Sequence, residues 1–279
     1  MFRRILQTFK YSIFPSKCLA CGLFFHPNQD RPAGKTPFDR IVHDPIETIF
    51  YRVMTPFLCP SCAQEFSPVH SPFCTTCGRM FKSKSGADHQ CGSCIQNKTL
   101  CHRIRAAGIY CGPLKSNIHA LKYKNKVHLA RPLGRLLFSS FMKYYDISTI
   151  DYILPVPLHI SRLKKRGFNQ AVMLINEWPV LINLSNVNRK INTDRFMHID
   201  CKNLVRKRKT LSQTGLGKEK RKENVKGAFA VTDKSKISGK QVLLIDDVHT
   251  TGSTCDECAD TLIASGAKTV SVLTLARAD

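Results

Sequence analysis

A loop of small polar residues follows two adjacent carboxylates near the end of the chain, in the stretch VLLIDDVHTTGST at 242–254. The apolar run at 241–245 predicts a buried strand, and apolar side chains at helical spacing from Thr254 to Gly266 predict a helix, after which KTVSVLTLA predicts a second strand. In such a unit the loop lies at the helix N-terminus, where unpaired N–H groups and the helix dipole favour a phosphate. The loop hydroxyls and Gly252 suit the same anion, because glycine lets the backbone approach a ligand closely.

The two carboxylates would repel a phosphate if they touched it. We therefore expect Asp246 and Asp247 to accept hydrogen bonds from sugar hydroxyls or to hold a hydrated cation. Other phosphate motifs fail: the chain has no G-x-x-x-x-G-K-[ST], and GLGKEK at 215–220 lacks a third glycine and a preceding strand. The structural alternative is a polar strand-to-helix turn with Thr254 as the N-cap, but the whole arrangement favours a phosphate site.

The first hundred residues contain four Cys-x-x-Cys pairs. Two such pairs can close one tetrahedral zinc site, so we predict one or two structural Zn²⁺ ions. A disulfide framework is typical of secreted proteins, and the N-terminal stretch MFRRILQTFKYSIF lacks the continuous apolar segment and cleavage site of a secretory signal. The grouping in chain order is the simplest, but the long gap between the first two pairs leaves a single site or a crossed pairing open. The predicted zinc ligands are Cys18, Cys21, Cys59, Cys62, Cys74, Cys77, Cys91 and Cys94.

Cys255 and Cys258 form a fifth pair, at the start of the predicted C-terminal helix. There a thiol–disulfide motif is conceivable. Both cysteines fall on the same helical stripe as Leu262 and Ile263, which favours core packing. Cys101, Cys111 and Cys201 have no pairing pattern, and we assign them no special role.

Two basic segments precede the strand at 241–245. In the first, at 151–170, an apolar strand is stopped by prolines and runs into a basic loop, which suits either a polyanion such as pyrophosphate or plain solvation as a charged turn. The second, at 202–226, holds ten Lys or Arg against two Glu, and its Gly and Ser predict a mobile loop rather than a packed element. Since the net charge is +23, we expect a polyanionic partner for it. The candidate basic contacts are Arg162, Lys165, Arg166, Arg206, Lys207, Arg208, Lys209 and Arg221.

The length and composition of the chain limit the number of domains and the class of protein. At 279 residues and 43% hydrophobic, the chain is long enough for two domains with a sizeable core. No run approaches 18 apolar residues, so we expect no membrane span and a cytoplasmic location. For the mixed basic and apolar stretch at 1–14 we favour a helix docked on the protein over one at a membrane surface.

The strand, the two acidic residues and the Thr-Thr-Gly loop resemble those of type I phosphoribosyltransferases. More narrowly, the chain resembles the ComF proteins of natural competence and DNA utilisation over nearly its whole length. The likeness rests on the cysteine pairs, IHALKYKNKVHLARPLGRLL, PVPLHISRLKKRGFNQA, TLSQTGLGKEKRKENVKGAF and the C-terminal stretch from VLLIDD onward. The long gap between the first two cysteine pairs and the stretch at 177–205 depart from the family pattern.

The resemblance implies an α/β fold in which helices flank a type I phosphoribosyltransferase-like parallel sheet at 101–279, after an N-terminal Cys-rich zinc-ribbon domain at 1–100. It also implies a site for phosphoribosyl pyrophosphate (PRPP) with its Mg²⁺. The acidic pair would hold the ribose hydroxyls, the loop at 249–254 the 5′-phosphate and the loop with Arg162 and Arg166 the pyrophosphate, while the segment at 206–226 would close over the site. The implied PRPP-binding residues are Asp246, Asp247, Val248, His249, Thr250, Thr251, Gly252, Ser253 and Thr254.

Two functions remain open at this stage. One is the handling of single-stranded DNA, together with other competence proteins, by a chain with a PRPP-type pocket. The other is phosphoribosyl transfer from PRPP to an unidentified nitrogen acceptor. The sequence displays no general base and no base-recognition pocket, and only Phe168 and Phe229 are nearby candidates for stacking. A small substrate has little use for ten basic residues at 202–226, so DNA handling is favoured.

Overall fold

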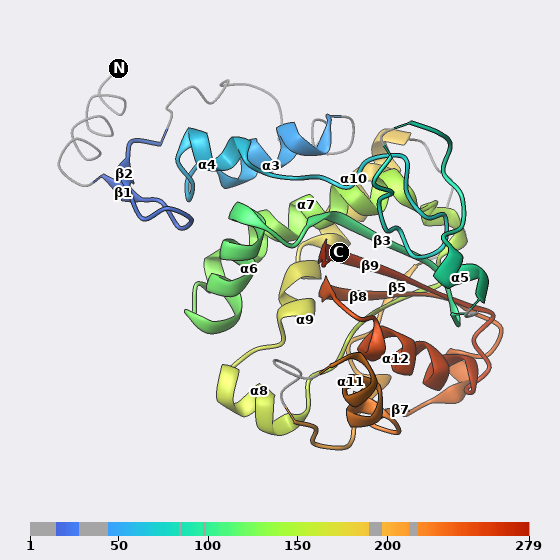
Figure 1. The fold of residues 1–279 in the computed structure, drawn as a ribbon. Coiled ribbons are helices and arrows are strands. Elements are labelled where there is room, and N and C mark those ends of the chain that lie inside the picture. The colour runs from blue at the N-terminus through green and yellow to red at the C-terminus, as the bar shows by residue number, and fades with distance from the viewer. Residues whose placement is uncertain are drawn as a thin grey trace.

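The computed structural model describes residues 15–27, 44–83, 85–96, 99–189, 197–211 and 217–278. Its centre is a sheet of five parallel strands (Figure 1). The predicted helix at 1–14 lies outside the described residues. In spatial order the strands are β3 (Cys101–Ile109), β9 (Thr269–Arg277), β8 (Gln241–His249), β4 (Tyr152–Pro155) and β5 (His198–Ile199).

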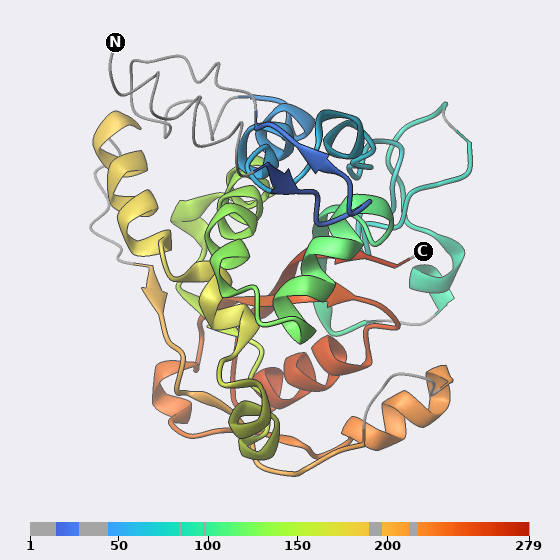
Figure 2. The same cartoon turned by 90° about the vertical axis from the view of Figure 1, so that its left-hand side faces the viewer.

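Helices cover both faces of this sheet, as the near-continuous apolar runs of its central strands require. On one face lie α7 (Ala130–Tyr144) and α9 (Gln170–Ile175), and on the other lies α12 (Ser253–Ile263). Figures 1 and 2 both show α7 above the strands and α12 below them. The predicted α/β class, a parallel sheet flanked by helices, is confirmed.

The chain leaves neighbouring strands β4 and β8 in opposite directions. β4 leads through α9 to β5 at one edge, whereas β8 leads through α12 on the other face to β9. This makes β4 and β8 the topological switch point, where the loops after two adjacent strands separate and leave a crevice. The fold therefore brings the segments after Pro155 and after Asp246 to one cavity.

The N-terminal elements share a hydrophobic core with α7 and α9, the helices on one face of the sheet. Helix α3 (Ile46–Met54) packs on α7, and its buried Phe50 and Met54 belong to the same cluster as Leu133 and Leu137. Figure 2 shows the blue hairpin in front of these helices. The boundary near residue 100 stays a prediction. The other elements of this region are β1 (Ser16–Lys17), β2 (Phe24–Phe25), α4 (Pro60–Gln64) and α5 (Gly92–Gln96).

Elements around the switch point complete the fold. A two-stranded antiparallel sheet of β6 (Leu204–Arg206) and β7 (Phe229–Val231) lies on the α12 side. No helix among the described residues is long and apolar enough to cross a membrane. The remaining elements are α6 (Gly112–Tyr123), η1 (Val127–Leu129), η2 (Ile147–Thr149), α8 (Ile160–Arg166), α10 (Trp178–Arg189), α11 (Lys218–Val225) and η3 (Lys234–Lys236).

Two local predictions were wrong, and so was the alternative in which Thr254 caps the helix. The strand expected to end at 245 continues to His249, because β8 stays hydrogen-bonded to β9 as far as the pair His249–Arg277. Helix α12 begins at Ser253 after Gly252, so Thr254 is not its N-cap. The segment at 202–226 was expected to be unpacked throughout, but it contains β6, which pairs with β7, and α11, which packs on α12.

Candidate functional site

The two predicted carboxylates lie within strand β8, not after it. Asp246 is partly exposed, and its Oδ1 accepts a hydrogen bond of 2.8 Å from the backbone N–H of Asp247. Asp247 is buried and pairs with the ammonium of Lys122, at 2.7 Å between Nζ and Oδ2. Replacing Asp247 by alanine would therefore leave the ammonium of Lys122 without this carboxylate.

The interactions among Lys122, Asp246 and Asp247 determine which of these groups are charged. Desolvation of the carboxyl within the cavity, reinforced by the neighbouring Asp247, raises the pKa of Asp246 to about 7. Burial works against the charge of Lys122, but the attraction of Asp247 outweighs it and raises the lysine pKa above its ordinary value. At neutral pH the site thus holds a fixed ammonium–carboxylate pair beside a second carboxyl that can gain or lose a proton.

The loop after β8 turns at a left-handed glycine and leads directly into α12. Gly252 has φ of +83°, and a Cβ there would lie 3.1 Å from both Nε2 of His249 and a carboxylate oxygen of Asp256, so the position demands glycine. The next residue begins α12, whose first N–H groups have no partner within the helix. Thr251 and Ser253 face each other with hydroxyl oxygens 3.0 Å apart.

The ring of His249 lies against Gly252 of this loop and is neutral. It is buried, and burial, with the nearby Arg277, lowers its pKa to about 4. Within the described part of the chain neither ring nitrogen has a hydrogen-bond partner. The neutral imidazole adds no positive charge beside the loop, whereas Arg221 brings one, since its guanidinium donates to the hydroxyl of Thr250 at 3.3 Å.

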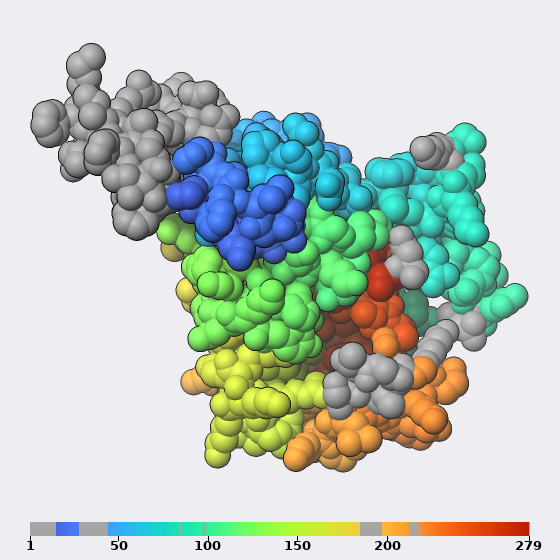
Figure 3. Space-filling view, turned by 60° about the vertical axis from the view of Figure 1, so that its left-hand side comes forward, coloured from blue at the N-terminus to red at the C-terminus, as the bar shows by residue number. Residues whose placement is uncertain are grey.

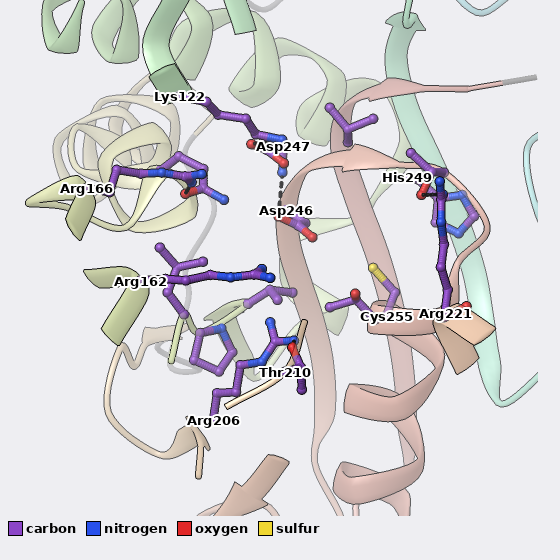
Figure 4. Close-up of a pocket in the computed structure, with 18 of the residues that line it drawn as sticks. Lys122, Arg162, Arg166, Arg206, Thr210, Arg221, Asp246, Asp247, His249 and Cys255 are labelled. Atoms are coloured by element: carbon purple, nitrogen blue, oxygen red, sulfur yellow. Dashed lines mark hydrogen bonds and ion pairs between the residues drawn. The ribbon is translucent and has the colours of Figure 1, made fainter. Parts of the chain in front are cut away.

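A cavity of about 1070 Å³ opens at the switch point (Figures 3 and 4). Asp246, Asp247 and most of the loop that follows form its floor. In Figure 3 the red C-terminal segment is set back between the green segment, which includes α6, and the orange segment. Its described lining has far more positive than negative charge, which favours an anionic ligand. The cations that line it are Lys122, Arg162, Lys165, Arg166, Arg206, Lys209 and Arg221.

Two of these guanidinium groups are set into the wall. Arg206 is buried, donates to the hydroxyl of Thr210 at 2.5 Å, and lies 5.1 Å from the ring centre of Phe229. Burial lowers the pKa of both Arg206 and Arg162, but an arginine starts so high that it stays charged. Among the described residues no carboxylate lies within salt-bridge distance of either group. Desolvated cations without a counter-ion favour an anionic ligand.

The structure brings six of the eight predicted basic residues to the cavity and leaves two outside it. Lys207 and Arg208 are exposed and do not line the wall. Arg208 instead donates to the backbone oxygens of Asn224, at 3.0 Å, and Lys226, at 2.6 Å, and so ties down the end of α11. Of the loop residues, Thr251 faces a smaller cavity behind the loop.

The eight predicted metal ligands form two groups of four, in chain order. Cys18, Cys21, Cys59 and Cys62 make one, and the other four make the second, each with all sulfur atoms within 4.8 Å of one another. Four sulfurs about 2.3 Å from a tetrahedral zinc stand about 3.8 Å apart. The separations of 3.8 Å between Cys21 and Cys59 and 3.9 Å in the second group match this spacing.

Backbone N–H groups point at the sulfurs of both groups. Sγ of Cys74 accepts from the amides of Cys77, at 3.4 Å, and Cys91, at 3.3 Å, and Sγ of Cys18 accepts from Cys59 at 3.4 Å. Such donors stabilise thiolate, the form that binds zinc. All thirteen cysteines of the chain are described and none is in a disulfide. Two groups that can each hold Zn²⁺ replace the single or crossed site that the sequence left open.

The fifth pair belongs to the core, as predicted. Cys255 and Cys258 are buried within the apolar cluster between α12 and the sheet. Burial raises the pKa of both thiols well above the ordinary value. Neither is therefore suited to thiol–disulfide exchange.

Comparison with known proteins decides the family. No protein-family model matches the chain. Competence protein F of Haemophilus influenzae is 30% identical over 228 residues, which cover 79% of this chain and 90% of that protein. DNA utilization protein YhgH of Escherichia coli K12 is 30% identical over 238 residues, covering 80% and 97%. Competence protein ComFC of Bacillus subtilis is 24% identical over 234 residues, covering 79% and 84%. The chain belongs to the ComF family.

In this ComF-family chain the sequence reasoning missed several residues of the cavity. Lys122, Tyr123 and Asn125 come from the end of α6, and Tyr110 comes from just before it. All but Tyr110 lie in or beside a motif that carried the family resemblance, yet no local pattern marks them as site residues. Their signal is the contact of Lys122 with Asp247, 125 positions away, which only the fold creates.

Proposed function

We propose that this ComF-family chain acts in natural competence or DNA utilisation, in the cytoplasm and alongside other competence proteins. Its cavity would bind a phosphorylated sugar of the PRPP type, and the neighbouring basic surface would bind single-stranded DNA. The names of the relatives support the biological role. The observation that carries the ligand class is an excess of cations, among them the buried Arg206 and the half-buried Arg162, in a cavity that also holds a carboxylate pair and a helix N-terminus.

The parts of the cavity suggest a role for each part of such a ligand. Asp246 is the freer carboxyl, since Asp247 already binds Lys122, and it would accept hydrogen bonds from the ribose hydroxyls. The start of α12 and the hydroxyls at 250–254 would hold the 5′-phosphate. Arg162 and Arg206 would face the pyrophosphate, with Mg²⁺ arriving as part of the ligand, as in type I phosphoribosyltransferases.

The basic surface extends beyond what a small ligand can contact. Lys207 is exposed outside the cavity, while Lys209 is exposed at its edge. The exposed Lys220 and Lys222 of α11 continue this positive surface. A flexible single strand can reach such a surface from the cavity, and its phosphates would neutralise the charge.

Salt dependence tests the DNA assignment. If about five phosphates are neutralised, log affinity for a thymidine oligomer falls with log salt at a slope of about −3.5. Changing Lys207 and Lys209 to Gln removes two contacts and should make the slope shallower by about 1.4, to about −2.1. Arg208 is left intact because it ties down α11. The matched control changes Lys236 and Lys268 to Gln. Both are exposed and lie just before β8 and β9, at the amino ends of the strands and away from the cavity, so this variant should keep the wild-type slope. A wild-type slope near zero would remove DNA from the proposal.

Phosphoribosyl transfer to a nitrogen acceptor is a second candidate. It is favoured by the carboxyl of Asp246, whose pKa of about 7 suits proton transfer at neutral pH. Incubation of PRPP and Mg²⁺ with a panel of nucleobases and amines, with pyrophosphate release as the readout, tests it. Release that depends on one acceptor and is lost in Asp246→Asn supports transfer, and its absence with every acceptor leaves the cavity a binding site.

A further inference from the structure

A second cavity, of about 390 Å³, lies between the second cysteine group and the loop at 249–254. It is lined by three cysteines of that group and by the first four residues of the loop. Figure 4 shows His249, which faces this second cavity, across β8 from Arg162, which lines the larger one. Among the described residues that line either cavity there is no cysteine of the first group. The second group alone therefore shares a cavity with the candidate phosphate loop.

Arg277, at the end of β9, links the second cysteine group to the start of the loop. Its side chain is buried, and its guanidinium donates a hydrogen bond to the backbone oxygen of Cys77. Its main chain pairs with that of His249, the last residue of β8. The N–H of Ala278 then donates to the carbonyl oxygen of His249 at 2.9 Å. Arg277 thus contacts the cysteine turn through its side chain and the loop through its main chain.

The turn that carries Cys77 fits closely against Arg277 and β3. Gly78 has φ of +71°, and a Cβ there would lie 2.6 Å from the carbonyl oxygen of Ile104 and 3.5 Å from Nη1 of Arg277. The N–H of Ile104 also donates to the carbonyl oxygen of Thr76 at 2.8 Å. Because protein interiors are close-packed, this turn has little room to move without moving Arg277.

A second link reaches the end of the loop through Asp256, in the first turn of α12. One carboxylate oxygen, Oδ1, accepts a hydrogen bond from the hydroxyl of Thr99 at 3.4 Å. The other, Oδ2, would lie 3.1 Å from a Cβ at Gly252, so the carboxylate lies directly against the loop. The chain around the second cysteine group therefore holds the loop at both ends, through Arg277 and through Asp256.

The two links come from the two halves of the second cysteine group. Arg277 contacts the turn at 74–77, whereas Thr99 follows the turn at 91–94. Four thiolates on one zinc ion fix such turns relative to each other, and the binding energy of the metal becomes folding energy. The first group packs instead in the core cluster that contains α3 and α4. Zinc in the second group would thus fix the two points that hold the loop.

We propose that zinc binding at the second cysteine group and ligand binding at the loop are coupled, with Arg277 as the positioning residue between them. This inference rests on the proposed function, because the ligand is the phosphorylated sugar of the larger cavity. Coupling is reciprocal: if zinc tightens the binding of the ligand, the ligand must tighten the binding of zinc by the same factor. Coupled sites commonly change one another's affinity by about 5- to 150-fold.

The test measures the affinity for zinc by competition with a chelator, on the full chain, with and without saturating ribose 5-phosphate. One of the two zinc ions should be held about 5- to 150-fold more tightly when the sugar phosphate is present, and the other should be unaffected. Cys21→Ser weakens the first group alone, so in this variant the ion that responds should be the one still held by four thiolates. A response by the ion of the first group, or by both ions alike, would refute the coupling.

Variants of Arg277 test its role as the link. Arg277→Met should still bind two zinc ions but lose the response to ribose 5-phosphate, and Arg277→Lys, which can donate to the oxygen of Cys77, should keep it. Arg79→Met is the matched control, because it removes an exposed guanidinium from the lining of the same cavity, and it should respond like the wild type. A wild-type response in Arg277→Met would exclude Arg277 as the link.

The outcomes separate this inference from the proposed function. If ribose 5-phosphate binds to the zinc-loaded wild type but changes the affinity for neither zinc ion, the coupling is refuted and the sugar-phosphate cavity stands. If ribose 5-phosphate does not bind, the proposed function fails and the coupling with it.

Discussion

The ion pair between Lys122 and Asp247 should hold the site together, and Lys122→Met removes one partner while keeping a long apolar side chain. The side chains are 15% and 4% exposed, so the pair belongs to the buried class rather than to surface pairs worth about 0–1 kcal/mol. At 2.7 Å and an effective dielectric constant near 20, their attraction is about 6 kcal/mol, most of it offset by desolvation. Loss of the lysine leaves Asp247 buried without its cation, which costs about 3–5 kcal/mol.

A double-mutant cycle measures this coupling. Urea unfolding of wild type, Lys122→Met, Asp247→Asn and the double variant should show that the double variant loses about 2 kcal/mol less than the sum of the single changes. The pKa of Lys122 is raised, so the pair contributes fully below the ordinary lysine pKa and is lost only as the pH rises through the higher folded value. Neutral buffer therefore reports the whole effect.

The neighbouring Lys124 supplies the control. It is exposed, and Lys124→Met should change the free energy of unfolding by less than about 0.5 kcal/mol. A cost below about 1 kcal/mol for Lys122→Met, or single-variant costs that simply add, would refute the reasoning that a buried pair organises the acidic end of β8.

Other consequences follow from the same structure. Elemental analysis should find two zinc ions per chain, and chelation should unfold the N-terminal hundred residues first; protein without zinc, its cysteines oxidised in pairs, would contradict both sites. Asp246→Asn should raise the free energy of unfolding by up to about 4 kcal/mol near pH 8 and hardly change it near pH 4. The pKa of about 7 means that the ionised carboxylate destabilises the folded state at high pH, and Asn removes that cost. An effect independent of pH would be inconsistent with that pKa. Gly134→Ala should destabilise the fold by about 1–3 kcal/mol in thermal unfolding, since its Cβ would collide with the carbonyl oxygen of Leu174. An unchanged melting temperature would argue against this close helix contact.

Features that depend on neighbouring residues in the chain could be predicted from the sequence. The spacing of the cysteine pairs and the order of strand, loop and helix at 241–266 are local patterns, and the structure has both. The end of β8 could not be read in this way. Hydropathy stops the strand at the first carboxylate, whereas hydrogen bonding to β9 carries it through Asp246 and Asp247 to His249.

Features that depend on tertiary contact could not be predicted. Helix α11 is polar on all sides and reads as a loop, but the burial of Val225 and the bonds from Arg208 hold its end. Lys122 and Tyr123 gain their roles only because the fold carries α6 to the end of β8. Charge and composition could suggest an anionic partner, whereas the three-dimensional arrangement was needed to show which cations are buried in the cavity, Arg206 above all.

Calorimetry with PRPP and Mg²⁺ on wild type and Arg206→Met tests the central claim, a cavity whose desolvated cations bind a phosphorylated sugar. The wild type should bind with measurable heat, and the variant should bind about 10- to 150-fold more weakly, the loss expected for one hydrogen bond to a charged group. Lys234→Met, which removes an exposed charge at the other edge of the sheet, should bind like the wild type. No heat with the wild type, or wild-type affinity in Arg206→Met, would contradict the account.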